Sequence, residues 1–360
     1  FLSPVVIAPV IALIGLSLFN SPDITTATQN WWLTGFTLLA IVGFSQYLDA
    51  NAKLFELFPV LLGIVTAWLV AAVLSVAGVF GPEASGYVDL ASVAAADPVH
   101  LIYPLQWGTP SVTPAFVIGM LAGVAASIIE SIGDYHAVAH LSGEGAPSGK
   151  RMTHGIGMEG LMNVFSGLMG TSGSTSYSEN VGAIGLTGVA SRYVVQVGAG
   201  VMLIVGFVGY FGQLVATIPG PIVGGLYIAM FGQIVAIGLS NLTHVDLNSS
   251  RNIFVLGITL FTGMAIPEYV RNVGGAGAFQ EGLANTFLLG PLLGGDVVAN
   301  TIYVIASTGM AVGGIVAIVL DNTIGGTDEE RGLAAWEALA EADVDFASPY
   351  DRFLGDEEST

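Results

Sequence analysis

Four acidic side chains fall inside or at the ends of long apolar stretches of this 360-residue chain: Glu130, Asp134, Glu159 and Glu179. A charged group at the centre of a bilayer costs about 2.5–3.5 kcal/mol on insertion scales. Each of these carboxylates should therefore face a cavity, a polar partner or a functional ion. They are the first candidates for chemistry in this sequence.

Glu130 and Asp134 stand four positions apart in the stretch IIESIGDYHAVAH. That spacing places both carboxylates on one face of a helix, about 5–6 Å apart at Cβ. Two carboxylates this close in a low dielectric do not both ionise easily, so one titrates upward or the two share a cation. A carrier coupled to H⁺ or Na⁺ needs such a pair. The alternative for Asp134 is a solvated position at the cytoplasmic end of its helix.

Glu179 and Asn180 follow a Ser/Thr-rich stretch, TSGSTSYS, that is a poor start for a membrane helix. Ser178 can cap a helix that begins at Glu179, so the sequence predicts a short strand plus a half-helix across 171–190. Transporters place such broken elements at mid-membrane, with the helix N-terminus pointed at the substrate. Glu179 could there accept hydrogen bonds from the ring N–H groups of a ligand, or it could be a structural cap.

The other polar residues of the apolar stretches give weaker signals. Glu159, in GIGMEGLMN, is expected to be a structural residue that bonds to a neighbouring helix. His136 and His140 are spaced like a metal pair, but the sequence shows no third ligand, so we interpret them as interfacial side chains and predict no metal and no cofactor besides a coupling ion. A nucleophile–base pattern and a phosphate loop are both missing from the sequence, so an enzyme is not predicted.

Membrane spans must position these residues. Only 10% of the chain is charged, 53% is hydrophobic and 49 residues are Gly. This profile is typical of a polytopic membrane protein, because about 20 apolar residues cross a bilayer core. The sequence predicts an all-α polytopic fold with about ten transmembrane helices, near 4–20, 31–48, 57–80, 113–137, 154–170, 178–190, 193–216, 221–241, 252–268 and 297–320.

Charge distribution orients these spans. If ten spans alternate, seven of the eight Lys and Arg fall on one side and only Arg271 falls on the other. The positive-inside rule then places the C-terminus in the cytoplasm, where 323–360 forms an acidic tail. The chain opens on an apolar stretch without Met or a basic leader, so we expect it to begin inside a longer protein. The absence of cysteine excludes disulfides, and a basic nucleic-acid footprint is missing.

The half-helix carries a family motif. The nucleobase–ascorbate transporter family, also called xanthine/uracil permeases, has the pattern Gln/Glu/Pro-Asn-x-Gly-x-x-x-x-Thr-Arg/Lys/Gly, and this chain resembles it with Glu179, Asn180, Gly182, Thr187 and Gly188.

Three further stretches extend the resemblance over essentially the whole chain. ESIGD, at 130–134, is similar to the eukaryotic-type version of the acidic eighth span of the family. The stretches GLSNLTHVDLNSSRNIFVLG (238–257) and LDNTIGGTDEERG (320–332) resemble the ascorbate-transporting branch.

The resemblance implies a fold of fourteen spans in two inverted seven-span repeats, divided into a core and a gate domain. The ten spans here would be the fifth to fourteenth. Residues 1–110 and 219–322 would form gate helices, and 111–218 would form core helices. The first four spans, including the half-helix that completes the site, would be missing. A homodimer through the gate domain is also implied.

The resemblance also implies roles for individual residues. Glu130 and Glu179 would bind a nucleobase from two helices, with Asn180 beside them. Backbone groups of Tyr177 and Ser178 would approach the ligand. Asp134 occupies the coupling position, which is His in bacterial uracil permeases, so the choice between H⁺ and Na⁺ stays open. Gly182, Thr187 and Gly188 would be structural.

The sequence therefore predicts a secondary active transporter of the cell membrane. We expect H⁺- or Na⁺-coupled symport of a nucleobase such as uracil or xanthine, because ascorbate carriers have Pro where this chain has Glu179. One alternative is a carrier of ascorbate or another polar organic acid. The other is a truncated, non-transporting remnant that serves as a binding or assembly subunit.

Overall fold

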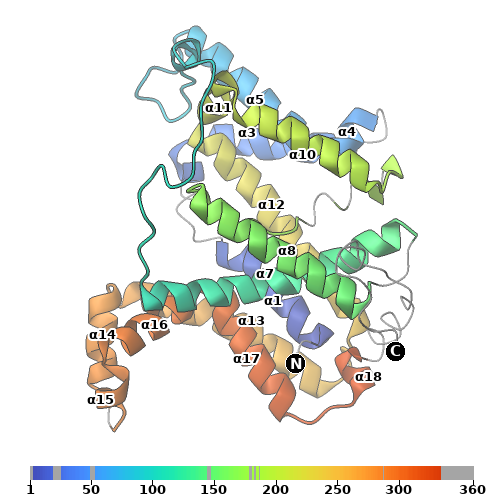
Figure 1. The fold of residues 1–360 in the computed structure, drawn as a ribbon, viewed down its shortest axis with the longest axis vertical. Helices are drawn as coiled ribbons and strands as arrows, with labels where there is room; N and C mark the ends of the chain where they lie inside the picture. Colours follow the sequence, from blue (N-terminus) through green and yellow to red (C-terminus); the bar gives the residue numbers. More distant parts are fainter. Residues whose placement is uncertain are drawn as a thin grey trace, which may run out of the picture. The chain divides into compact units, whose positions relative to one another are not determined.

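The architecture comes from a computed structural model, which describes residues 3–18, 26–48, 53–143, 147–177, 181, 184–185, 187–286 and 288–333. These residues are overwhelmingly helical (Figure 1). Within the same ranges, the β contact is a single isolated bridge between Val99 and Val208. The predicted all-α class is confirmed.

Four helices in the described ranges are long and apolar enough to cross a membrane. They are α5 (Pro59–Val76), α7 (Pro114–Leu141), α12 (Gly220–Ser240) and α13 (Ser250–Asn272). A fifth crossing is possible if α16 (Asp296–Ala306) and α17 (Gly309–Thr323) count as one span.

Other predicted spans coincide with shorter or more polar helices. These are α1 (Pro4–Ser17), α3 (Trp31–Val42) with a π-turn at Gly43–Tyr47, α8 (Gly149–Leu168), and α10 (Arg192–Gly206) followed by α11 (Gly209–Ala216). The short span predicted at 178–190 is helical at Val181, Ile184, Gly185 and Thr187. Ser178, Glu179, Asn180 and Gly182 lie outside the described residues.

Two spans that the sequence predicts as continuous are broken. The stretch 193–216 divides at Phe207 and Val208, where His100 N–H donates to the Phe207 carbonyl at 2.9 Å. The stretch 297–320 bends by 91° at Ser307 and Thr308. Both of these hydroxyls donate back to the Val304 carbonyl, a local alternative to continued helical bonding that hydropathy does not reveal.

The chain packs as two compact units, and each is described by itself. Unit 1 contains Phe1–Leu13, Pro104–Ala190 and Gly238–Thr360, and unit 2 contains Ile14–Tyr103 and Ser191–Ile237. Helices α1 and α12 contribute to both units. The division into core and gate domains stays a prediction.

In unit 1, α13 and α17 lie side by side (Figure 1), and Leu13 of α1 contacts both. The buried Leu13 side chain fits between them because both helices present glycine. A Cβ at Gly263 would lie 2.5 Å from Leu13 Cδ1, and one at Gly313 would lie 2.1 Å from the same atom. Small residues at such crossings let membrane helices approach closely.

The same unit also contains the short helices α14 (Ala276–Ala284), α15 (Gly290–Leu293) and α18 (Asp328–Arg331). α14 and α15 occupy the Gly-rich segment between α13 and α16.

In unit 2, α3 packs against α5 through the close approach of Gly63 to Ile41, where a Cβ would meet Ile41 Cγ1 at 2.4 Å. The core of this unit gathers Leu33, Ala67, Ala71, Phe80 and Ile222. Short helices α4 (Lys53–Leu57) and α6 (Leu90–Ala94) and a 3₁₀ turn at Thr26–Gln29 complete it, and a second 3₁₀ turn, Asn241–His244, follows α12 in unit 1.

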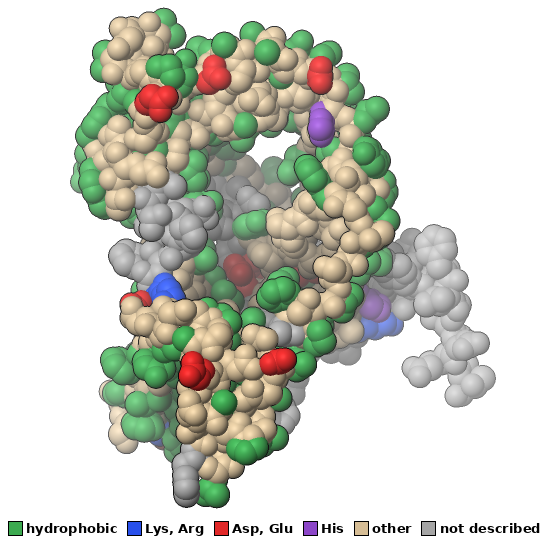
Figure 2. Space-filling view, turned by 90° about the vertical axis from the view of Figure 1, so that its left-hand side faces the viewer, with side chains coloured by type: hydrophobic (Ala, Val, Ile, Leu, Met, Phe, Trp, Pro, Cys, Tyr) green, Lys and Arg blue, Asp and Glu red, His purple; other side chains and the backbone are tan. Residues whose placement is uncertain are grey.

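Large apolar side chains cover much of the exposed surface. α10 buries none of its residues and exposes Met202, Leu203 and Ile204, each at 68% or more. Figure 2 shows one face with hydrophobic side chains spread over it and few charged ones. An exposed surface with this many large apolar side chains suits a membrane protein.

Candidate functional site

Glu159 is the centre of a polar interface inside unit 1. Its carboxylate, on α8, accepts three hydroxyl hydrogen bonds: from Ser131 Oγ to Oε2 at 2.8 Å, from Tyr135 OH to Oε1 at 2.7 Å and from Ser176 Oγ to Oε1 at 2.5 Å. The predicted bond from Glu159 to a neighbouring helix is confirmed. Hydrogen bonds to an ionised acceptor are shorter and stronger than neutral ones, so this group joins α7, α8 and the segment after α8.

Helical spacing explains why α7 can supply two of these donors. Ser131 and Tyr135 stand four positions apart, which places them on one face of α7. The Tyr135 ring fits against α8 because residue 155 is glycine, where a Cβ would lie 2.7 Å from Tyr135 Cε2. Ser127, a further turn earlier on the same face, donates to Thr175 Oγ1 at 2.5 Å.

The short strand predicted at the start of 171–190 is wrong: residues 171–177 run without helix or strand bonding, and side chains of neighbouring helices bond them in its place. Three polar groups of this segment bond side chains of the two helices. In addition to the bonds at Thr175 and Ser176, the Ser174 N–H donates to Asn163 Oδ1 at 2.6 Å, one turn beyond Glu159 on α8. Irregular backbone at membrane depth is tolerated only when protein or a wet cavity satisfies it, and here α7 and α8 do so.

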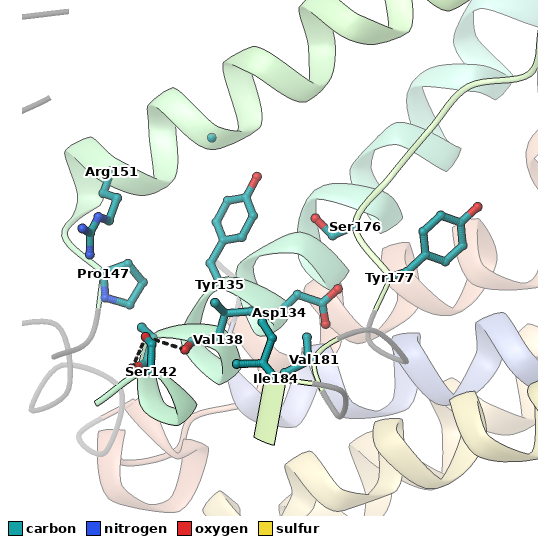
Figure 3. A pocket seen from close by; sticks show the side chains of 12 residues that line it. Asp134, Tyr135, Val138, Ser142, Pro147, Arg151, Ser176, Tyr177, Val181 and Ile184 are labelled. Carbon is teal, nitrogen blue, oxygen red and sulfur yellow. Dashed lines mark hydrogen bonds between the residues drawn. The ribbon is translucent and has the colours of Figure 1, made fainter. Parts of the chain in front are cut away.

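A cavity of about 540 Å³ opens beside this interface. Its size is within the range of small-molecule sites. Its walls come from α7, the start of α8, the end of the extended segment and the short helical stretch that follows, as Figure 3 shows. The lining residues are Asp134, Tyr135, Val138, Ala139, Ser142, Pro147, Arg151, Gly155, Ser176, Tyr177, Val181 and Ile184.

Two predicted site residues line this cavity. Asp134 is 7% exposed and reaches the cavity from α7. Tyr177 also lines it, but its side chain is 57% exposed and Figure 3 shows the ring directed away from Asp134. The predicted backbone role of Tyr177 is compatible with that orientation. Glu130 lies one turn before Asp134, half-buried, and is not among the described residues that line this cavity.

The last two residues of the family motif, Thr187 and Gly188, end a short helical stretch. Gly188 has a φ of +65° and its N–H donates to the Ile184 carbonyl at 2.9 Å, so it closes the short helical stretch in a left-handed conformation that suits glycine. Thr187 Oγ1 accepts a bond from the Val189 N–H at 3.3 Å. The motif positions Glu179, Asn180 and Gly182, together with Ser178, are outside the described residues.

Sequence reasoning missed Ser131, Tyr135, Ser176 and Arg151 as members of this region. A signal for two of them was present, because Ser131 and Tyr135 repeat at a spacing of four beside Glu130 and Asp134. Arg151 follows the N-cap Ser148, whose Oγ accepts from the Arg151 N–H at 3.3 Å, and this cap fixes where α8 begins.

A second buried carboxylate lies elsewhere in unit 1. Asp321, at the end of α17, has a fully buried side chain that bonds Arg251 Nη2 at 2.8 Å and Arg331 Nη2 at 2.7 Å. Ser3 Oγ donates to the same carboxylate at 2.8 Å, which brings in the start of α1. The buried Asn252 side chain adds a bond to the Glu330 carbonyl at 2.7 Å. We call Asp321, Arg251, Arg331 and Ser3 the Asp321 cluster.

The sequence did not predict the Asp321 cluster. Its two arginines come from the stretches 238–257 and 320–332 that carry part of the family resemblance. The structure therefore shows that these two distant stretches meet at one buried ion pair network.

Comparison with known proteins identifies the family of this chain. A family model described as "Permease family" matches residues 1–271. Solute carrier family 23 member 2 of Homo sapiens is 42% identical over 363 residues, which cover 94% of this chain and 53% of that protein. Solute carrier family 23 member 1 of Mus musculus is 40% identical over 367 residues, covering 95% of this chain and 58% of the relative. Nucleobase-ascorbate transporter 2 of Arabidopsis thaliana is 35% identical over 357 residues, covering 93% and 65%.

The helices and the extent of the family match define a multi-pass membrane protein of the all-α class. The chain belongs to the permease family. It spans about half to two thirds of the length of these relatives.

Proposed function

We propose that the protein to which this chain belongs is a secondary active transporter, not an enzyme, that carries a nucleobase such as uracil or xanthine by symport with H⁺ or Na⁺. The observation that carries the proposal is the cavity between α7, α8 and the extended segment, with the buried Asp134 in its wall. A carboxylate in such a place is expensive unless it faces a polar partner, a cation or a ligand, and the cavity gives a cation or a ligand room to reach it.

In this proposal the residues have distinct tasks. Glu130 and Glu179 accept hydrogen bonds from ring N–H groups, with Asn180 and the backbone of Tyr177 and Ser178 completing the contact. The coupling cation binds near Asp134 and lowers the free energy of loading the ligand. The core helices then move against the gate helices and carry the ligand across the membrane.

The setting belongs to the proposal as well. The protein would reside in the cell membrane as a homodimer formed through gate helices, with a cytoplasmic C-terminus. Arg251 and Arg331 bond the same carboxylate, so they lie on one side of the membrane, which supports this orientation because basic residues gather on the cytoplasmic side.

A second candidate is a carrier of ascorbate or another organic acid. Arg151 lines the same cavity as Asp134, and a guanidinium in that wall favours an anionic ligand. The plant relative is itself named a nucleobase-ascorbate transporter, which keeps ascorbate among the candidate ligands. The remaining rival, a non-transporting subunit, is tested by whether the complete reading frame confers uptake at all.

Uptake of radiolabelled uracil in cells that lack their own base carriers tests the proposal. We expect accumulation that collapses when the H⁺ and Na⁺ gradients are removed, and competition by xanthine or uric acid. Competition by ascorbate alone would favour the second candidate.

Glu179→Gln should abolish or redirect recognition while leaving membrane insertion intact, because the amide keeps the shape of the side chain and loses its charge. Asp134→Asn should leave exchange of bound base but remove accumulation against a gradient. Unchanged accumulation in both variants would refute the assigned roles.

A further inference from the structure

A turn at residues 104–108 is fastened to the C-terminal end of α8. The Leu105 N–H donates to the Leu168 carbonyl at 2.7 Å, and the Gly108 N–H donates back to the Leu105 carbonyl at 2.9 Å. The last carbonyls of a helix have no partner within the helix. Here a segment from far earlier in the chain caps one of them.

The Trp107 ring adds a second attachment point. A Cβ on Gly170 would lie 2.0 Å from Trp107 Cδ1 and 2.7 Å from Nε1, so the ring edge occupies the space where any other residue would place its side chain. Gly170 has a φ of +73°, and its N–H donates to the Gly167 carbonyl at 3.1 Å as the helix ends. Position 170 therefore needs glycine for its backbone and for the ring.

The turn is held in a strained conformation. Leu105 has a φ of +60°, a left-handed value that is unfavourable for a leucine. Such conformations persist where the surroundings over-determine them, and they concentrate at functional sites. The bond to Leu168 and the ring contact at Gly170 are the surroundings that hold this one.

The attachment controls where the extended segment begins. Thr171, directly after Gly170, donates its N–H to the Ser166 carbonyl at 3.0 Å, and the segment then runs to its bonds with Asn163, Ser127 and Glu159. We infer that Leu105 and Trp107 are positioning residues: they fix the end of α8 and thereby the register in which residues 174–177 meet α7, α8 and the cavity. The consequence for uptake rests on the proposed function.

Amide hydrogen exchange tests the inference without reference to transport. Trp107→Ala should accelerate exchange of the hydrogen-bonded Thr171 and Ser174 amides of segment 171–177 roughly tenfold, the change expected for losing an interaction of the size of one hydrogen bond. Gly170→Ala should do the same, because its methyl group displaces the ring. Trp107→Phe should restore most of the protection.

The effects of Trp107→Ala and Gly170→Ala on the exchange rates should not be additive. Gly170→Ala should accelerate exchange less in the Trp107→Ala background than in the unmodified protein, because the clash with the ring is already gone. Exchange within α13 should stay unchanged in all variants, which separates positioning from general loss of stability. Trp31→Ala is the matched control, since Trp31 is also an exposed tryptophan, at 64%, and lies in unit 2.

Uptake of radiolabelled uracil by the complete protein gives the second readout. Trp107→Ala should raise KM several-fold at nearly constant maximal rate, and Trp107→Phe should reverse this. Absence of uptake in the unmodified protein would refute the proposed function and leave the exchange result standing. Unchanged exchange at 171–177 in both Trp107→Ala and Gly170→Ala would overturn the inference.

Discussion

Glu159 and Asp321 are two carboxylates of the same compact unit, and their partners differ in kind. Asp321 is fully buried and bonds two guanidinium groups, whereas the donors to Glu159 among the described residues are the hydroxyls of Ser131, Tyr135 and Ser176. Hydroxyl groups can turn to donate or accept, but guanidinium groups can only donate. The Asp321 cluster therefore requires a permanent negative charge, and the Glu159 interface tolerates a change of charge.

We expect this difference to separate a site that holds the fold together from one that positions the walls of the cavity. A buried ion pair that loses one partner leaves an uncompensated charge, so its integrity governs whether the unit folds. A carboxylate among hydroxyls, beside a cavity and bonded directly to Ser176 of segment 174–176, is instead expected to set how the walls of the site lie. We expect substitutions at the two places to act on different quantities.

Asp321→Asn should give the largest loss of stability. It would leave Arg251 and Arg331 buried at 8% and 17% side-chain exposure without their anion, at a cost of about 3–5 kcal/mol in the free energy of unfolding. Chemical unfolding of the purified protein in a mild detergent measures this value. Asp328→Asn is the control, because that carboxylate is 68% exposed and 4.0 Å from Arg331, and it should change stability by less than about 1 kcal/mol.

Arg331→Gln should have a smaller effect, about 2–3 kcal/mol, because Arg251 still neutralises Asp321. Arg331→Lys should recover only part of it, since an ammonium group cannot reproduce the contacts that Nε and Nη2 make with the carboxylate. The hydrogen bond to Asp321 raises the pKa of Arg331 above its usual range. Its stabilisation is present below the unfolded-state pKa, so the difference between the two proteins should stay constant from about pH 7 to pH 10. A difference that vanished within this range would argue against the ion pair.

Tyr135→Phe should cost about 1.5 kcal/mol, because it removes one hydrogen bond to the Glu159 carboxylate and leaves the ring packed against Gly155. Tyr177→Phe provides the comparison, since that ring is 57% exposed, and it should be nearly neutral. Equal losses for the two variants would mean that the hydroxyl of Tyr135 contributes nothing specific.

Glu159→Gln should change stability least, by less than about 1 kcal/mol, because the three hydroxyls can reorient around an amide. Its effect on uptake should nevertheless be at least about tenfold, because bonds to a neutral amide are weaker than bonds to a carboxylate and hold residues 174–176 in place less strictly. An uptake rate equal to that of the unmodified protein would remove Glu159 from the functional account.

Local patterns in the sequence were sufficient for part of this picture. Hydropathy located helices near nine of the ten expected spans, and the spacing of Glu130 and Asp134 placed both on one helix. The apolar surroundings of Glu159 also predicted a bond to a neighbouring helix, and Ser131 and Tyr135 of α7 supply such bonds. These inferences depend on residues within a few turns of one another.

The rest depends on contacts between distant residues. The Asp321 cluster joins residues 3, 251, 321 and 331. These residues lie at the start of α1 and in three other helices, so their spacing in the sequence does not indicate that they meet. The breaks at Phe207 and Thr308 follow from a bridge to Val99 and from side-chain bonds to a carbonyl, and neither changes the hydropathy of the stretch. The contact between Trp107 and Gly170 likewise joins a stretch between two predicted spans to the end of another predicted span, and nothing in the local sequence pairs them.

Parallel measurement of unfolding and uptake on Glu159→Gln and Arg331→Gln, each produced in the complete protein, tests the central claim most directly. Our account predicts opposite outcomes: Glu159→Gln keeps its stability and loses uptake, while Arg331→Gln loses stability and, at a temperature where it is still folded, takes up base at a nearly normal rate. If uptake and stability fall together in both variants, the distinction between the two carboxylates is contradicted.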